Sequence, residues 1–275
     1  GLVETGRPLL YGALVASDPE MVAGSLGPGA RIVLTDTNRK EGRRWGTLRE
    51  TTGFTERADE DHDPENLADR PLAVLPMHPG YQSVARHNGL RVDASGYGNP
   101  VTFTPGDRPF HAVDGREDTA WRVGAFSDVR GEFLTLRLDE GRDLEGLTVV
   151  QAGGVNQNRW ITGLRVSVDG DSYDVVLDQS SRRPPGQWVP FKTNGSPSTI
   201  VLEIRGTDVG QRRHYAGLSA VGFSEVVLDG LEASDTIILP TRLAATIGPD
   251  REAELVVLLT RQRSEPRDPE RHDPE

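Results

Sequence analysis

The sequence contains no cysteine, and this absence excludes several kinds of chemistry at once. A chain without thiols has no disulfide framework, no thiol nucleophile and no zinc site built on cysteine. No apolar run reaches the roughly 18–20 residues of a membrane-spanning helix, and none near the start resembles a signal peptide. Because the chain begins without Met and ends in a charged run with several prolines, we expect it to be a piece of a longer protein.

Aromatic residues and positive charges are also scarce. Only 6% of the 275 residues are aromatic and 35% are hydrophobic, whereas Gly (31) and Pro (19) are frequent. This composition favours a turn-rich fold of short strands over long helices. The chain carries 42 acidic residues against 31 basic ones, a net charge of −11. A surface that binds nucleic acid needs clustered cations, so we expect no nucleic-acid partner.

Signatures of catalysis are missing as well. The six histidines are scattered without the spacing of metal ligands, and neither a Gly-x-Ser-x-Gly motif nor a phosphate-binding glycine loop is present. Pairs of carboxylates are easy to nominate in a chain with 42 acids, so they carry no signal for glycoside hydrolysis. We therefore expect no independent active site.

Residues 1–91 are predicted to form an α/β segment. Apolar runs at 9–11 and 31–35 predict two strands, and Ser17-Asp18-Pro19-Glu20 predicts a helix start, with the helix ending near residue 27. The acidic stretch 56–71 lacks large apolar side chains, so it is predicted to be a solvated loop. Its aspartates resemble the start of a calcium loop, but the Gly and the Glu that such a loop requires are missing.

From about residue 92 the hydrophobic pattern changes to period two, which predicts an antiparallel β-sandwich over 92–230. Strands are predicted near 134–138, 147–151, 164–168, 173–178, 200–204, 217–222 and 224–228, and Asp169-Gly170 predicts a tight hairpin. Trp188 is predicted to lie in the core. Two more apolar runs suggest C-terminal strands within 231–260, and 261–275 is predicted to be an extended linker.

The segment from His111 to Trp121 is the most informative stretch. Asp114-Gly115 begins a tight turn, and a carboxylate followed five residues later by the hydroxyl of Thr119 can surround one hard cation. Main-chain carbonyl oxygens can complete an oxygen cage of the type that calcium prefers. Trp121 is large enough to fill the end of the sandwich below this turn. The alternative is that Asp114 and Thr119 only hydrogen-bond the turn.

This segment, with Val221-Gly222-Phe223-Ser224-Glu225-Val226 near the end, resembles the discoidin (coagulation factor 5/8 type C) family, a galactose-binding-like jelly roll. The resemblance implies a structural calcium ion held by Asp114, Thr119 and Glu225, with main-chain oxygens near His111 and Arg116. The family often has Asn or Asp where this chain has Arg116, so that position can offer only its carbonyl oxygen, and its cation opposes a metal.

A second resemblance extends along the chain. Four segments are similar to the soluble region of actinobacterial arabinofuranosyltransferases: Leu34-Thr35-Asp36-Thr37-Asn38-Arg39, Arg43-Arg44-Trp45-Gly46, Ala94-Ser95-Gly96-Tyr97-Gly98-Asn99-Pro100 and Ile238-Leu239-Pro240-Thr241. In that family a multispanning membrane enzyme builds cell-wall arabinan and carries discoidin-like modules on its extracytoplasmic side. The resemblance implies the extracytoplasmic face of the membrane as the location and the rest of the membrane protein as a partner. It implies no catalytic residue in this segment.

Two segments offer groups that bind sugars. Sugar sites combine an aromatic face with planar polar side chains that bond hydroxyl groups. The candidates are Asn156, Asn158, Arg159 and Trp160 between two predicted strands, and Arg213 and His214 in the basic stretch 212–215. The alternatives are that Trp160 belongs to the core, that the amides satisfy a turn, and that 212–215 is a solvated loop.

The sequence therefore predicts a non-catalytic region that binds a cell-wall polysaccharide, arabinan or galactan, near a membrane glycosyltransferase. The alternative is a calcium-stabilised scaffold that braces neighbouring domains and binds no glycan.

Overall fold

The computed structural model describes residues 31–35, 57, 84–98, 104–154, 157–192, 195–239, 254–258, 260–262 and 272–274. The chain forms two compact units, and each is treated by itself. The larger unit contains residues 87–236, and the smaller one contains the strands that flank them in the sequence. The domain boundaries expected at residues 91, 230 and 260 stay predictions.

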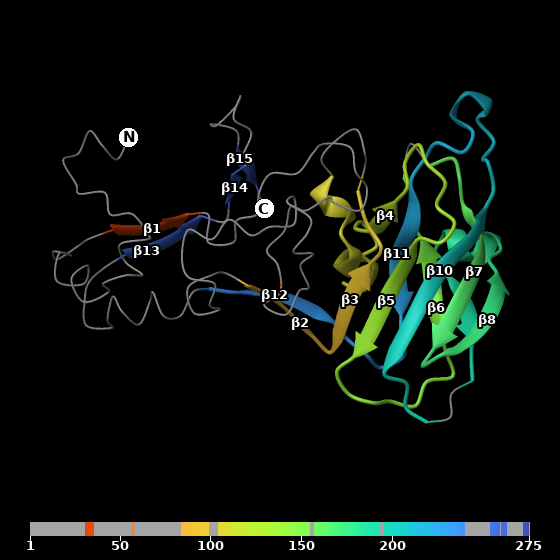
Figure 1. Cartoon of the computed structure of the whole chain (residues 1–275), viewed down its shortest axis with the longest axis horizontal. Coiled ribbons are helices and arrows are strands. Elements are labelled where there is room, and N and C mark those ends of the chain that lie inside the picture. Colours follow the sequence, from red (N-terminus) through yellow and green to blue (C-terminus); the bar gives the residue numbers. More distant parts are fainter. Residues whose placement is uncertain are drawn as a thin grey trace, which may run out of the picture. The chain divides into compact units, whose positions relative to one another are not determined.

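Two antiparallel sheets form the larger unit (Figure 1). The five-stranded sheet has the spatial order β3 (Leu90–Ala94), β5 (Phe133–Leu138), β10 (Thr199–Thr207), β7 (Ile161–Val168), β8 (Asp171–Val176). The four-stranded sheet has the order β4 (Trp121–Val123), β11 (Val221–Val227), β6 (Gly146–Gln151), β9 (Gln187–Pro190). Short 3-10 turns are the only helices in the described residues: η5 (Pro105–Asp107), η6 (Pro109–Ala112), η7 (Gln179–Arg182), η8 (Arg213–Tyr215). The predicted antiparallel β-sandwich is confirmed.

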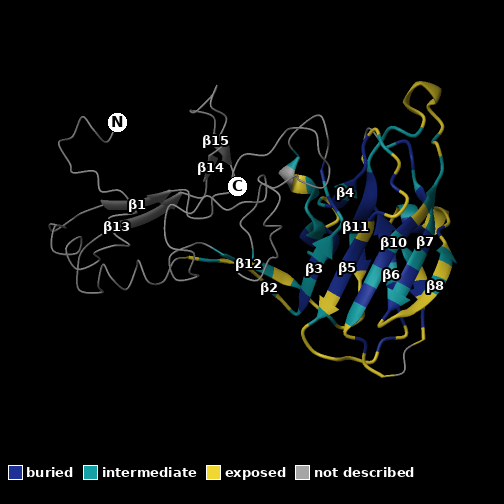
Figure 2. Ribbon diagram, viewed as in Figure 1, coloured by how far each residue is buried: buried dark blue, intermediate teal, exposed yellow. Residues whose placement is uncertain are grey.

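The core lies between the sheets because apolar residues alternate with polar ones along each strand. In β10, Ile200, Leu202 and Ile204 are fully buried. Leu202 lies opposite Leu134 of β5 and Val166 of β7, so one apolar row crosses three strands. Figure 2 shows the buried residues concentrated on the strands of the two sheets. Burying each such side chain contributes about 1.5–3 kcal/mol to folding.

Trp121 occupies the core as predicted. It has no exposed surface, its ring stacks on Phe223 with the centroids 5.9 Å apart, and its Nε1 atom donates to the carbonyl oxygen of Gly96 at 2.9 Å. The Asp169-Gly170 hairpin is also confirmed, between β7 and β8. Both residues have positive φ, 47° and 104°, the backbone that a tight two-residue hairpin needs.

Two predictions in this unit are wrong. Trp188 is 44% exposed, because it alternates with the buried Val189 on β9 and faces outward from an edge strand. The structure has one strand here, β11 (Val221–Val227), in place of the two predicted at 217–222 and 224–228. Its register shifts between Phe223 and Glu225, and this bulge interrupts the alternation that the sequence pattern relies on.

Paired strands flank the sandwich in the sequence. The strand predicted at 31–35 is β1 (Arg31–Thr35), which pairs in parallel with β13 (Glu254–Leu258). Strand β2 (Val84–Asn88) pairs with β12 (Ser234–Ile238), and β14 (Thr260–Gln262) pairs with β15 (His272–Pro274). The predicted strand at 9–11 and the predicted helix lie outside the described residues, as does the acidic stretch 56–71 apart from Arg57. Among the described residues, no helix has the length and apolar character needed to cross a membrane.

Candidate functional site

The turn after η6 brings two expected calcium ligands together. The hydroxyl of Thr119 lies 2.8 and 2.9 Å from the two carboxylate oxygens of Asp114 and 3.0 Å from the carbonyl oxygen of Arg116. The backbone N–H of Arg116 donates to Asp114 Oδ1 at 3.1 Å. Gly115, with φ of 72°, provides the left-handed backbone that closes the turn. This oxygen cluster is compatible with both alternatives: a bound calcium ion, or a turn held only by its own hydrogen bonds.

The side chains of His111 and Arg116 are engaged elsewhere. His111 Nδ1 lies 2.6 Å from the carbonyl oxygen of Gly106, and its Nε2 accepts a hydrogen bond from Arg108 Nε at 3.0 Å. Burial lowers the pKa of His111, which favours the neutral ring. The guanidinium of Arg116 forms two hydrogen bonds, 3.1 and 2.9 Å, to the exposed Asp118. These two positions can therefore offer a metal only their main-chain oxygens.

Glu225 approaches the same turn from β11. Burial, together with the negative charge of Asp114, raises its pKa to about 7, although hydrogen bonds from the N–H groups of Gly115 and Arg116 oppose the shift. Its Oε2 atom is buried without a hydrogen-bond partner. An unpartnered carboxylate oxygen beside a second carboxylate is costly without a cation.

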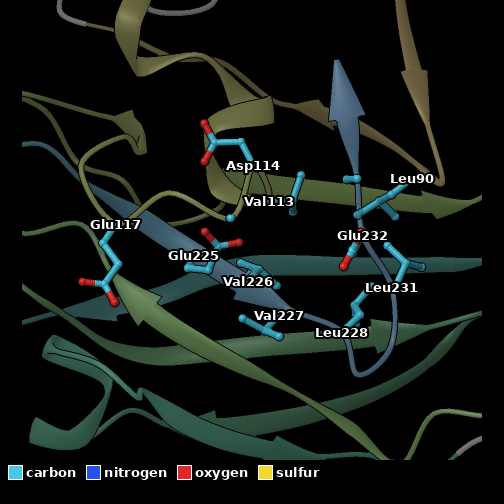
Figure 3. Close-up of a pocket in the computed structure, with 12 residues that line it drawn as sticks. Leu90, Val113, Asp114, Glu117, Glu225, Val226, Val227, Leu228, Leu231 and Glu232 are labelled. Carbon is cyan, nitrogen blue, oxygen red and sulfur yellow. The ribbon is translucent and has the colours of Figure 1, made fainter. Parts of the chain in front are cut away.

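A cavity of about 470 Å³ opens at this point of the sandwich (Figure 3). Its acidic lining consists of Asp114, Glu117, Glu225 and Glu232, and its other walls are largely apolar. Among the described residues, no group of three or more His, Asp or Glu side chains has the arrangement of a metal site. A calcium ion here would thus depend on main-chain oxygens as well as on Asp114, Thr119 and Glu225, and calcium binding stays a prediction.

The sugar-binding candidates fall into two groups, buried and exposed. Asn158 is buried, and its Nδ2 atom lies 2.9 Å from the carbonyl oxygen of Tyr215 and 3.3 Å from that of Arg212. Its Oδ1 atom accepts from the N–H of Arg212 at 2.8 Å. The amide is therefore saturated by the backbone at both ends of η8. Asn156 lies outside the described residues.

Arg159 is only 4% exposed, and its guanidinium links two loops. It donates to the carbonyl oxygens of Ser219 at 3.0 Å, Ser127 at 2.9 Å and Gly124 at 2.8 Å. Within the described part of the chain no carboxylate forms an ion pair with it, and burial lowers its pKa. The structure thus places Arg159 beneath the surface, where it holds the β4–β5 connection against the β10–β11 connection.

Trp160 is half-buried and lies under a second arginine. The guanidinium of Arg182 lies 5.1 Å from the Trp160 ring centroid, within the range of a cation–π contact. The same arginine contacts Asp208 at 3.2 Å, and Asp208 accepts from the Trp160 backbone N–H at 2.8 Å. Part of the ring that could stack on a sugar is thus occupied by Arg182.

Arg213 and His214 lie in η8 and are exposed. Neither side chain makes a hydrogen bond or ion pair within the part of the chain that the structure describes. Asn158 and Arg159 hold the segments on either side of them. The buried candidates therefore position the exposed ones. The sequence pattern did not distinguish these two roles.

Two exposed aromatic residues at the same end were missed. Phe126 is 56% exposed and Tyr215 is 61% exposed. Phe126 has φ of 65°, unusual for a bulky residue, and its N–H donates to the carbonyl oxygen of Leu218 at 2.9 Å. An aromatic residue inside the turn Gly124-Ala125-Phe126-Ser127-Asp128 is a signal that could have identified it.

These residues share one end of the sandwich, which we name the loop end. It consists of the connections β4–β5 (124–132), β6–β7 (152–160), β8–β9 (177–186) and β10–β11 (208–220). Antiparallel pairing within each sheet brings them together. The side chain of Gln151 at the end of β6 links the two sheets there, because it bonds both the N–H and the carbonyl oxygen of Ile161 at the start of β7. Figure 1 shows these connections on the upper side of the two sheets.

No protein-family model matches the sequence, and a comparison with curated proteins finds no match. Among solved structures, the chain is similar to part of the arabinofuranosyltransferase AftD from Mycobacteria, with a TM-score of 0.57 and 19% identity over 94% of this chain and 19% of that chain. A mutant of the same enzyme gives a TM-score of 0.57 and 18% identity over 81% of this chain and 17% of that chain. This chain thus spans less than a fifth of the AftD chain.

A family 32 carbohydrate-binding module from NanJ of C. perfringens, solved with galactose, is also similar. The match covers 55% of this chain and 100% of that module, with 12% identity and a TM-score of 0.34. At 18–19% identity the likeness to AftD is one of fold. The resemblance to a region of an arabinofuranosyltransferase, predicted from the sequence, is confirmed at that level.

Proposed function

We propose that this chain is a non-catalytic carbohydrate-binding region that holds a cell-wall polysaccharide at the loop end. The observation that carries the proposal is the pair of exposed rings, Phe126 and Tyr215, next to the exposed donors Arg213 and His214. Sugar rings stack on aromatic faces while charged and polar donors bond their hydroxyl groups.

The way in which the loop end is held supports this proposal. Arg159 bonds three carbonyl groups across the β4–β5 and β10–β11 connections, and Asn158 bonds the backbone on both sides of η8. A rigid surface loses less conformational entropy when it binds a ligand. The left-handed backbone of Phe126 is the kind of local strain that persists at binding sites because the surroundings enforce it.

The setting of this function is proposed from the fold likeness to part of AftD and from the sequence resemblance to its family. We propose arabinan or galactan as the polysaccharide and the extracytoplasmic face of the membrane as the location. The remaining part of a larger membrane transferase is then the protein partner, and the transfer chemistry belongs to that part. This chain supplies binding and orientation only.

A structural calcium ion is the second part of the proposal. The residues that would hold it are Asp114, Thr119 and Glu225, together with main-chain oxygens near His111 and Arg116. Two features support this: the buried Glu225 Oε2 atom has no partner, and the Asp114 charge adds to the burial that raises the pKa of Glu225. A bound divalent cation would neutralise both carboxylates and tie β11 to the turn after η6.

The test of glycan binding is calorimetric titration of the 275-residue chain with arabinan and galactan oligosaccharides. We expect weak binding that Tyr215→Ala lowers by about tenfold or more. The matched control is Trp188→Ala, which removes an exposed ring from β9, away from the loop end. If Trp188→Ala abolishes binding and Tyr215→Ala does not, the site lies on the sheet face. If the unaltered chain binds no oligosaccharide at millimolar concentration, the scaffold alternative replaces this proposal.

A further inference from the structure

Acidic and basic residues are unevenly distributed between the connections at the two ends of the sandwich. The opposite end consists of the connections β5–β6 (139–145), β7–β8 (169–170), β9–β10 (191–198) and β11–β12 (228–233). These segments hold seven acidic and two basic residues, a surplus of five negative charges. The connections of the loop end hold four acidic residues and six arginines, a surplus of two positive charges. In a chain of net charge −11, these four connections are therefore a local exception.

Most of the acidic groups at the loop end are already bonded by their neighbours. Arg130 donates to the Asp128 carboxylate and holds its pKa down at about 2, and Arg182 contacts Asp208 at 3.2 Å. Asp178 accepts from the N–H of Ser180 at 2.7 Å. Among the described residues, none of these three acids forms an ion pair with Arg183 or Arg213. Such an uncompensated patch attracts anions, and the attraction weakens with salt.

The exposed cations lie where a ligand can reach them. Arg213 and Arg183 are exposed, and within the described ranges neither side chain makes a hydrogen bond or ion pair. A guanidinium donates two parallel hydrogen bonds to a carboxylate or a phosphate, a geometry that a neutral hydroxyl group does not match. Arg213 is also two residues from the exposed ring of Tyr215, so stacking and ion pairing can act on one ligand.

We propose that the loop end recognises an acidic glycan, one that carries carboxylate or phosphate groups, with Arg213 as the side chain that contacts the charge. This inference rests on the proposed glycan binding and names the ligand class of the same surface. An anionic membrane is disfavoured because the exposed apolar rings are few and Phe126 is followed two residues later by the ionised Asp128. A carboxylate beside an inserting ring would be repelled by anionic lipid and would lose its hydration.

The experiment measures binding of the full chain to four oligosaccharides of equal length and to one vesicle preparation. The neutral ligands are arabinan and galactan fragments, and the acidic ones are an oligogalacturonate for carboxylate and a phosphorylated oligomannoside for phosphate. The vesicles contain phosphatidylglycerol in phosphatidylcholine. Each titration is repeated as the NaCl concentration rises from about 50 to about 500 mM, where the screening length shortens severalfold.

Two charge-reversal variants, one at each end of the sandwich, are compared. Arg213→Glu changes the exposed cation of the loop end, and Lys192→Glu changes an exposed cation of the opposite end. We expect at least one acidic glycan to bind about tenfold or more tightly than the neutral ones at low salt. Its affinity should fall by about tenfold in Arg213→Glu and with added salt, and by less than about twofold in Lys192→Glu.

Each other outcome overturns the inference in a recognisable way. Equal binding of neutral and acidic glycans, both lost in Tyr215→Ala, leaves glycan binding in place and removes the acidic preference. Equal losses in Arg213→Glu and Lys192→Glu show that only the net charge matters. Binding to vesicles without binding to any soluble glycan identifies a membrane surface as the ligand. No binding to any ligand overturns the proposed function together with this inference.

Discussion

The Nδ2 atom of Asn158 donates a hydrogen bond to the carbonyl oxygen of Tyr215 across 2.9 Å. Asn158 is buried in the β6–β7 connection, whereas the Tyr215 ring is 61% exposed in the β10–β11 connection. The backbone that presents an exposed aromatic ring is thus held by a side chain from a different connection. The backbone conformation of the loop end thus depends on polar side chains that are themselves buried.

Arg159→Ala should lower the free energy of unfolding by about 3 kcal/mol or more, because three carbonyl groups lose their partner and a buried side chain is removed. Those groups belong to Ser219, Ser127 and Gly124. Equilibrium unfolding in urea measures the change. The control Arg205→Ala removes an exposed guanidinium and should cost less than about 1 kcal/mol. Equal costs for the two variants would show that Arg159 does not hold the loops.

Phe126→Gly should have a free energy of unfolding about 1 kcal/mol higher than that of Phe126→Ala, since both variants lose the same ring and only glycine adopts the left-handed backbone without strain. The same change should weaken glycan binding by about tenfold if the exposed ring stacks on the sugar. Phe126→Ala is the control: it loses the same ring and keeps the strain, so binding should fall equally in the two variants. Equal free energies of unfolding for the two variants would mean that the left-handed backbone of residue 126 carries no strain.

Calcium should raise the melting temperature of the unaltered chain by mass action, and Asp114→Ala should abolish that rise. The readout is the difference between melting curves in calcium and in chelator, because Asp114 also bonds the turn and its loss lowers the baseline. Asp139→Ala, which removes an exposed carboxylate elsewhere, should leave the difference unchanged. Identical curves for the unaltered chain in calcium and in chelator would exclude the calcium site.

In chelator, stability should depend on pH through Glu225. Its pKa is about 7 in the folded chain against the ordinary 4.5, so between these values the folded state binds more protons than the unfolded state. The free energy of unfolding therefore falls as pH rises from about 4.5 to 7, by an amount on the order of 1 kcal/mol for a half-buried group. Glu225→Gln should flatten this part of the profile. Parallel profiles for the two proteins, measured by urea unfolding, would contradict the expectation.

The strands were predictable because their signal is local. Alternation in Ile200, Leu202 and Ile204 requires only neighbouring residues, and a buried face follows directly from it. The turn at Asp169-Gly170 is equally local, since the two residues tolerate positive φ. Trp188 shows where the local signal fails: its exposure depends on β9 being an edge strand with an uncovered outer face, and no pattern within 186–191 reports that.

The sequence identified polar residues of the loop end but not the role of each one. Asn158 and Arg159 are the polar groups that a sugar site uses, yet the structure gives their hydrogen bonds to the backbone of 124–127 and 212–219. A donor in a sequence looks the same whether its acceptor is a ligand hydroxyl or a carbonyl 35 residues away. Phe126 was missed for the converse reason, because an apolar residue in a turn is usually expected to face inward.

The sequence by itself determined the antiparallel β-sandwich, the turn from Asp114 to Thr119 and the absence of thiol chemistry, since each follows from residue type and short-range order. Only the tertiary structure decided which polar groups are buried, which rings are exposed and how the charges divide between the two ends. Those properties arise from strands far apart in the chain that lie side by side. A carboxylate or guanidinium acquires its pKa, its partners and its accessibility from neighbours that the linear sequence does not place beside it.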